Sequence, residues 1–305
     1  MPEVFGFDCY SPREIAERVE NVGVTKARLP LISMVALGIL AGGFIGLGAM
    51  FFTLVQSDAG LSFAVARVLG GVVFSLGLML VVIAGAELFT GNNLLVMAWV
   101  SGRISWARLL LNLSVVFTAN LIGAAGLALL VAISGHAAMN HGAVGETAVA
   151  LAAAKCSLPF GEAFFKAVLG NILVCLAVWL AMAGRTVTDK MLAIVFPVSA
   201  FVACGFEHCI ANMYLIPLGI FLQDGLPPPA VTSLASPDWS GFIRNLIPVT
   251  LGNLTGGAGM VGLIYWIIYR RDRPATGNRQ DAQKKTAGGP QGATANLQLP
   301  YSGDR

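Results

Sequence analysis

The sequence GFEHCIAN, residues 205–212, interrupts an apolar run of the chain, and GAELFTGN, residues 85–92, interrupts an earlier one. Glycine, glutamate and asparagine stand at the same places in both strings, 120 positions apart. Apolar character continues after each interruption, at Leu94–Val100 and at Ile210–Leu222. Two such interruptions predict two membrane-spanning helices that are broken near their middles.

The rest of the chain is apolar enough for four unbroken spans. Of 305 residues, 56% are hydrophobic and 11% are charged, whereas a soluble domain carries about 25% charged residues. A helix needs about 20 apolar residues to cross a bilayer. The unbroken candidates are Leu31–Val55, Leu109–Ile133, Ala167–Ala183 and Asn245–Tyr269, and the broken ones begin with Val68–Ala86 and Met191–Phe206. We therefore predict an all-α polytopic membrane protein with six transmembrane helices, of which helices 2 and 5 are broken.

A second internal repeat connects the third and sixth predicted spans. Four asparagines and glycines recur 133 positions later: Asn112, Asn120, Gly123 and Gly126 as Asn245, Asn253, Gly256 and Gly259. Three spans are an odd number, so the second copy must enter the membrane in the opposite direction. We predict two inverted three-helix repeats, about residues 29–134 and 161–272, with a substrate path where their breaks meet near the midplane.

The basic residues predict the orientation of the spans. Eleven lysines and arginines flank the spans on the side of both termini, and four lie on the opposite side. By the positive-inside rule, both termini are expected in the cytoplasm, with the protein in the plasma (inner) membrane. Topology thus explains the net charge of +3, and we expect the lipid bilayer as a partner and no nucleic acid.

Three regions follow from these assignments. Residues 1–28 are expected to form a cytoplasmic amphipathic segment, 29–272 the six-span transporter domain, and 273–305 a disordered cytoplasmic tail. The first thirty residues contain Glu14, Arg18 and Glu20 instead of an apolar core. We therefore expect no cleavable signal peptide, and the first span should direct insertion.

Ionisable residues at the breaks are the first candidates for function, because a charge inside a membrane is costly. Glu87 and Glu207 occupy equivalent places in the two repeats, which favours a role in bracing the broken backbone. The counterpart of His208 is Leu88, and a polar group that one copy alone possesses is expected to serve the solute. Freed backbone groups and half-helix N-termini favour a polar or anionic solute.

Cysteines and histidines predict no metal or catalytic centre. The five cysteines, which show no CxxC or metal-ligand spacing, are Cys9, Cys156, Cys175, Cys204 and Cys209. His136 and His141 have no acidic partner at metal-ligand spacing, and the sequence has no HExxH motif or Ser–His pairing. We expect no cofactor, no metal and no catalytic residue. A membrane enzyme, such as an intramembrane protease or a quinone-reactive subunit, is the least favoured alternative.

The strings ELFTGNN, CLAVWLAMAGR, GFEHCIANMYLIPLGI and NLIPVTLGNLTGG resemble the formate/nitrite transporter family, over about residues 5–272. The resemblance implies a homopentamer of aquaporin-like protomers, each with its own pore for small monovalent anions. It implies a substrate path that includes His208, Thr90, Asn171 and Asn253, with an outer-vestibule lysine at Lys155. It also implies hydrophobic constrictions at Leu78, Leu88, Phe89, Phe74 and Phe201. Residues 91–93, Gly-Asn-Asn, depart from the Ser and Thr that formate channels have there.

The predicted function is a channel or transporter for formate or another small monocarboxylate or nitrite anion. An unescorted anion crosses an apolar constriction at great cost, and an imidazole can donate a proton near neutral pH. We expect Lys155 to attract the anion, Thr90 to orient it and His208 to protonate it, with Glu207 holding or tuning the ring. Nitrite or hydrosulfide as the substrate remains open, as does a channel or a proton-coupled carrier. A neutral-solute channel of aquaporin type is less favoured, because neither break contains Asn-Pro-Ala.

Overall fold

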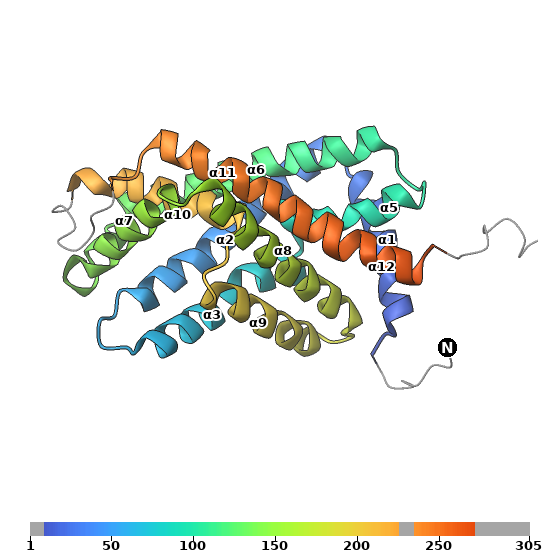
Figure 1. Ribbon diagram of the computed structural model, residues 1–305, viewed down its shortest axis with the longest axis horizontal. Helices are drawn as coiled ribbons and strands as arrows, with labels where there is room; N and C mark the ends of the chain where they lie inside the picture. The colour runs from blue at the N-terminus through green and yellow to red at the C-terminus, as the bar shows by residue number, and fades with distance from the viewer. Residues whose placement is uncertain (1–8, 226–234, 272–305) are drawn as a thin grey trace, which may run out of the picture. The chain divides into compact units, whose positions relative to one another are not determined.

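The computed structural model describes residues 9–225 and 235–271, which fold into helices with no strand in either range (Figure 1). Five helical stretches are long and apolar enough to cross a membrane. They are α2 (Leu31–Gln56), α3 with its π-helical extension (Phe63–Gly85), α6 (Trp106–Ile133), α8 (Phe160–Ala183), and α11 with its continuation through a π-helical segment into α12 (Trp239–Tyr269). The predicted all-helical membrane fold class is confirmed.

Two helices end at glycine turns inside the bundle and are followed by shorter helices. The first, α3 (Phe63–Met79) with its π-helical turn η1 (Leu80–Gly85), is followed by α4 (Phe89–Asn92), η2 (Asn93–Leu95) and α5 (Val96–Val100). The second, α9 (Val187–Ala203), is followed by α10 (Cys209–Leu222). Gly85 and Gly205 have φ angles of 83° and 72°, which glycine adopts without strain. Both breaks therefore lie where the polar strings predicted them.

The helices on either side of the breaks pack as two similar sets. In the first set α2 packs along α6, and in the second α8 packs along α11 (Trp239–Leu254). A Cβ atom at Gly123 would overlap the carbonyl oxygen of Ile39, and one at Gly256 would overlap that of Val168. Small residues allow such close approach of membrane helices. The repeated glycines in the sequence therefore mark a repeated mode of helix packing. Helices α3 and α9 pack against each other, α3 also along α2 and α9 also along α8, in the lower part of the view in Figure 1.

Five helices begin earlier than the sequence prediction placed them, α6, α9 and α11 among them. Helix α8 begins at Phe160 rather than Ala167, and α3 begins at Phe63 rather than Val68. The prediction ended each span at its first charged residue, such as Arg67. Helical hydrogen bonding continues past such a residue, because a long basic side chain reaches polar surroundings while its stem packs on apolar neighbours.

One helix was absent from the prediction. Helix α7 (Ala143–Cys156) lies between α6 and α8 in the chain and packs against α10. Two 3₁₀ turns, η3 (His136–Ala138) and η4 (Asn140–Gly142), connect it to α6, and another, η5 (Gln223–Gly225), follows α10. The sequence predicts no helix in this segment, which at 14 residues is too short to span a bilayer. Its helical form matters, because α7 carries Lys155.

The N-terminal helix α1 (Pro12–Ala27) lies at the end of the bundle opposite α7, beside α12 (Ile264–Tyr269), as Figure 1 shows. A capping box begins it: the amide of Ser11 donates to Glu14 Oε2 at 2.8 Å, and the amide of Glu14 donates to Ser11 Oγ at 3.4 Å. The predicted tail, 273–305, lies outside the described residues, as do the first eight residues of the predicted segment 1–28.

Candidate functional site

His208 lies where the short helices that follow the two breaks approach each other. It is the N-cap of α10, and its Nδ1 accepts a hydrogen bond of 3.2 Å from the amide of Ala211. Its Nε2 lies 2.9 Å from Oγ1 of Thr90 on α4, and both side chains are buried. Because Nδ1 accepts a hydrogen bond, the neutral ring carries its hydrogen on Nε2 and donates it to Thr90. The structure thus brings together two predicted path residues from opposite repeats.

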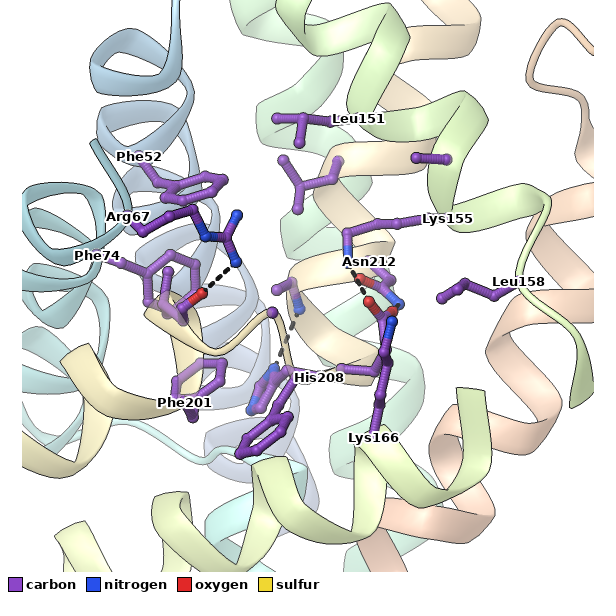
Figure 2. A pocket seen from close by; sticks show the side chains of 17 residues that line it. Phe52, Arg67, Phe74, Leu151, Lys155, Leu158, Lys166, Phe201, His208 and Asn212 are labelled. Atoms are coloured by element: carbon purple, nitrogen blue, oxygen red, sulfur yellow. Dashed lines mark hydrogen bonds and ion pairs between the residues drawn. The ribbon is translucent and has the colours of Figure 1, made fainter. Parts of the chain in front are cut away.

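A cavity of about 200 Å³, here the α7 cavity, opens between His208 and α7 (Figure 2). Phe74 and Phe201 line it beside the imidazole, with the two phenyl centroids 5.6 Å apart, edge to face. The ring of Phe201 lies 5.9 Å from that of His208. Two predicted constriction residues therefore stand against the histidine on this side, and Lys155 and Glu207 line the same cavity.

A second cavity, of about 350 Å³, lies on the side of α1 and is here the α1 cavity. Leu78 and Leu88 line it and are each 2% exposed, so the predicted constrictions fall on both sides of the Thr90–His208 contact. Phe89 is not among the lining residues of either cavity. Its ring packs edge to face against Phe117, with centroids 5.0 Å apart.

A lysine, a glutamate and two asparagines form one connected network beside the second break. Lys155 Nζ lies 2.7 Å from Glu207 Oε1, and the side-chain nitrogen Nδ2 of Asn212 donates to Glu207 Oε2 at 2.6 Å. The same nitrogen donates to Asn245 Oδ1 at 2.7 Å, and Asn245 Nδ2 donates to the carbonyl oxygen of Lys155 at 2.9 Å. The buried carboxylate is thus paired and hydrogen-bonded, which offsets the cost of its burial.

The first break has the same network, and sequence reasoning missed its lysine. Lys26 Nζ lies 2.9 Å from Glu87 Oε1, and Asn92 Nδ2 donates to Glu87 Oε2 at 2.7 Å and to Asn112 Oδ1 at 2.9 Å. Asn112 Nδ2 in turn donates to the carbonyl oxygen of Lys26 at 3.2 Å. Lys26 precedes the first span, and in the sequence it serves only as one of the basic residues that predict the orientation of the spans. The asparagines that recur in the two repeats indicate that the breaks share a motif, and a lysine in each copy completes it.

Two further asparagines bind the backbone groups that the breaks leave free. Asn253 Oδ1 accepts a hydrogen bond of 2.9 Å from the amide of Cys209, and its Nδ2 donates to the carbonyl oxygen of Glu207 at 3.1 Å. Asn120 bonds in the same way to the amide of Phe89 and to the carbonyl oxygen of the other break's glutamate. Asn253 therefore braces the broken helix, and its direct contact with solute stays a prediction.

Asn171, another predicted path residue, lies next to Thr90. Its Nδ2 donates to the carbonyl oxygen of Asn253 at 2.6 Å and lies 3.4 Å from that of Thr90. Its Oδ1 is buried and has no hydrogen-bond partner among the described residues. The residues of the two described ranges also contain no group of three or more His, Cys, Asp or Glu side chains arranged to hold a metal ion.

Known proteins share both this sequence and this architecture. The family model for formate/nitrite transporters matches residues 13–267. The formate channel FocA of Escherichia coli (strain K12) is 41% identical over 275 residues, which cover 87% of this chain and 96% of FocA. FocA of Haemophilus influenzae is 40% identical over 266 residues, 83% of this chain and 92% of that protein. A solved structure described as a pentameric formate channel with formate bound matches with a TM-score of 0.73 at 40% identity, covering 78% of this chain and 97% of that one.

Proposed function

Because the chain belongs to the formate/nitrite transporter family, we propose that it carries small monovalent anions, formate foremost, and that His208 contributes a proton during permeation. The observation that supports this proposal most is the place of His208. The ring borders the α7 cavity, whereas Leu88, its counterpart in the other repeat, borders the α1 cavity. A group that can carry a proton therefore stands at the apolar boundary between two cavities.

The apolar boundary explains why a proton is needed. Phe74, Phe201, Leu78 and Leu88 are each at most 4% exposed, and an anion that loses its hydration among such side chains gains nothing in return. The neutral acid crosses the same boundary at much lower cost. Protonation of the anion beside His208 therefore lowers the barrier that the phenylalanines and leucines create.

The hydrogen bonds of His208 couple its proton to the anion. The neutral ring has one hydrogen, on Nε2, so a proton can be transferred only from the imidazolium. Protonation at Nδ1 places an N–H against the amide of Ala211, 3.2 Å away, and removes the N-cap. An anion in contact with the ring compensates both the new charge and the lost bond. The imidazolium then transfers its Nε2 proton to formate, leaving formic acid and a neutral ring whose hydrogen is on Nδ1. Loss of that hydrogen to water in the α7 cavity and uptake of one at Nε2 restore the resting tautomer and the N-cap.

The lysines supply hydrogen-bond donors to the two cavities. Lys155 borders the α7 cavity and Lys26 the α1 cavity, and each ammonium group is held by a glutamate. Each pair is close to neutral as a whole, so it orients an anion without binding it too tightly to leave. Thr90 contacts the imidazole through its hydroxyl, Asn171 lies against Thr90, and Glu207 holds Lys155 at the cavity that His208 borders.

We also propose a homopentamer in the plasma (inner) membrane with both termini in the cytoplasm. The structurally similar protein described as a pentameric formate channel supports the assembly. Large apolar side chains such as Phe63, Ile133 and Phe196 are more than 70% exposed on this protomer, and lipid tails or neighbouring subunits can cover them. The excess of basic residues on the side of the termini supports the orientation.

Anion flux into proteoliposomes at two pH values tests this function. Formate, nitrite, lactate and hydrosulfide are compared on one preparation of the wild type, His208→Ala and His208→Asn. Asparagine can still accept the Ala211 amide bond but carries no proton. In the wild type, formate flux should be higher at the lower pH. Both variants should lose this increase. An unchanged pH profile in His208→Asn contradicts the proton role, and nitrite flux without formate flux contradicts the substrate assignment.

A further inference from the structure

Three basic side chains border the α7 cavity, and two of them are neutralised by carboxylates. Lys155 Nζ lies 2.7 Å from Glu207, and Lys166 Nζ lies 2.6 Å from Glu162 one turn away on α8. An anion that approaches either lysine meets its paired carboxylate at the same time. These two pairs therefore contribute little net positive charge to the cavity.

The third basic residue, Arg67, is bonded only to neutral groups. Its Nε donates to the carbonyl oxygen of Ala203 at 3.0 Å, and its Nη2 donates to that of Val202 at 2.7 Å. These carbonyls end α9, whose dipole offsets about half an elementary charge. A guanidinium keeps its full charge in proteins. Arg67 therefore brings to the α7 cavity a net positive charge that no described carboxylate contacts.

The position of Arg67 places this charge at the entrance to the constriction. Its Cζ lies 6.0 Å from the ring centroid of Phe52, and the Phe52 and Phe74 centroids are 6.5 Å apart. In Figure 2 its guanidinium points from α3 into the cavity, across from Lys155 and beside the aromatic rings that lead to His208. The two backbone bonds use two of the five guanidinium N–H donors. Among the described residues, none accepts a hydrogen bond from its Nη1.

We propose that Arg67 is the docking residue for anions that enter through the α7 cavity, and that it binds a carboxylate, or a similarly bent anion, before that anion reaches His208. The proposal rests on the proposed function and adds an entry step to it. A guanidinium presents parallel N–H groups that match the two oxygens of a carboxylate. Its bonds to the end of α9 hold the group in place, so little side-chain entropy is lost when the anion binds.

The repeat sharpens this inference, because only one copy has the arginine. At the spacing of 120 residues that relates the two breaks, the counterpart of Arg67 is Val187, at the start of α9. Among the described residues that line the α1 cavity, none supplies an equivalent charge, because Lys26 is paired with Glu87. Docking is expected on the α7 side alone, as protonation is expected at His208 and not at Leu88.

Binding of ¹³C-labelled formate to the purified full-length protein, followed by broadening of its NMR signal, tests the docking role. Arg67→Gln should raise the half-saturating formate concentration about tenfold, the usual loss for a charge-assisted hydrogen bond. Arg67→Lys keeps the charge but lacks the parallel N–H pair, so its half-saturating concentration should lie between those of the wild type and Arg67→Gln. Lys166→Gln removes a charge at the same cavity that is already paired, and is the matched control. Added salt should weaken binding in the wild type and in Arg67→Lys.

The outcomes separate a docking residue from a residue that only caps α9. Equal losses in Arg67→Lys and Arg67→Gln, or wild-type binding in Arg67→Gln, overturn the proposal, as does the absence of saturable broadening in the wild type. If Arg67→Gln does not assemble, the effect of added salt on formate binding to the wild type and to Arg67→Lys replaces that comparison. A half-saturating formate concentration that does not change with salt overturns the proposal. Formate flux is measured in parallel. A wild type that binds formate but does not conduct it contradicts the proposed function and leaves the docking role standing.

Discussion

Thr90 and His208 are 118 residues apart in the chain, yet Oγ1 of the threonine lies 2.9 Å from Nε2 of the histidine. This hydrogen bond joins α4 of the first repeat to the N-terminus of α10 of the second. The threonine accepts the Nε2 hydrogen and keeps its own hydroxyl hydrogen for another partner. A solute that reaches this point therefore meets the hydroxyl hydrogen of Thr90, which the imidazole of the other repeat orients.

Replacement of Thr90 by valine tests the importance of this contact. Valine has nearly the same shape but leaves the buried Nε2–H without an acceptor, which costs about 1–3 kcal/mol. Formate flux should fall about tenfold or more, and Thr90→Ser should restore most of it. Flux into proteoliposomes at constant pH measures the effect. Wild-type flux in Thr90→Val would show that the bond has no part in permeation.

The paired lysines predict a stability effect that a second substitution reverses. Lys26→Met leaves Glu87 buried without a counter-charge, and breaking a buried ion pair costs about 3–5 kcal/mol, less here because Lys26 is 25% exposed. The double variant Lys26→Met/Glu87→Gln removes the stranded charge and should regain most of the loss. Thermal unfolding of the solubilised protein compares the wild type, the single variant and the double variant. Equal stability of the single and double variants would contradict the pairing.

Local polarity made the broken helices predictable, because glycine turns and buried carboxylates stand out in an apolar sequence. Comparison of the repeats then singled out His208 against Leu88. The networks around Glu87 and Glu207 were not predictable in the same way. Lys26 meets Glu87 only after α1 folds back onto the bundle, and Lys155 is placed by α7, a helix too short to be recognised as a span.

The sequence also does not reveal which buried polar side chains form hydrogen bonds with the backbone. A buried asparagine in a repeat can line a path or brace a helix, and the residue type is the same in both cases. In the structure, the side-chain amide of Asn253 is hydrogen-bonded to backbone groups. Arg67 likewise contributes only to the predicted orientation of the spans, because its carbonyl partners lie more than 130 residues away in the chain and are not evident from the sequence.

Asn253→Leu tests bracing against direct contact with the solute. The substitution leaves the buried amide of Cys209 and the carbonyl oxygen of Glu207 without partners, each at a cost of about 1–3 kcal/mol. The unfolding temperature should fall strongly, while the ratio of formate to nitrite flux in the assembled fraction stays unchanged. A changed ratio with unchanged stability would indicate that Asn253 contacts the anion.

The last prediction concerns the attachment of α1, which forms part of the wall of the α1 cavity. Glu20 is 1% exposed and binds Arg270 at 2.6 Å, Arg103 at 3.0 Å and Ser101 at 3.1 Å. Burial alone would raise the pKa of Glu20, but hydrogen bonds and charge from Arg270 and Arg103 hold that pKa below its ordinary value of 4.5. The carboxylate thus ties α1 to α12 and to the turn before α6.

A lowered pKa in the folded state gives the sign of the pH dependence. The stabilisation by Glu20 is complete above pH 4.5, the ordinary pKa, and is lost as pH falls below that value through the lower folded pKa. Attachment of α1 should therefore be constant near neutral pH and weaken in acid. A fluorophore on the exposed Cys9, with Cys204 replaced by serine, reports the release of α1.

Two variants separate Glu20 from Glu14, an acidic residue in the first turn of the same helix. Glu14 also has a lowered pKa, because the backbone and side chain of Ser11 donate to it, so acid weakens the helix cap as well. Glu14→Gln should keep the acid-induced release, whereas Glu20→Gln should loosen α1 at neutral pH and flatten the fluorescence response to acid. If Glu20→Gln retains the wild-type transition, the ion pairs with Arg103 and Arg270 do not hold α1 in place.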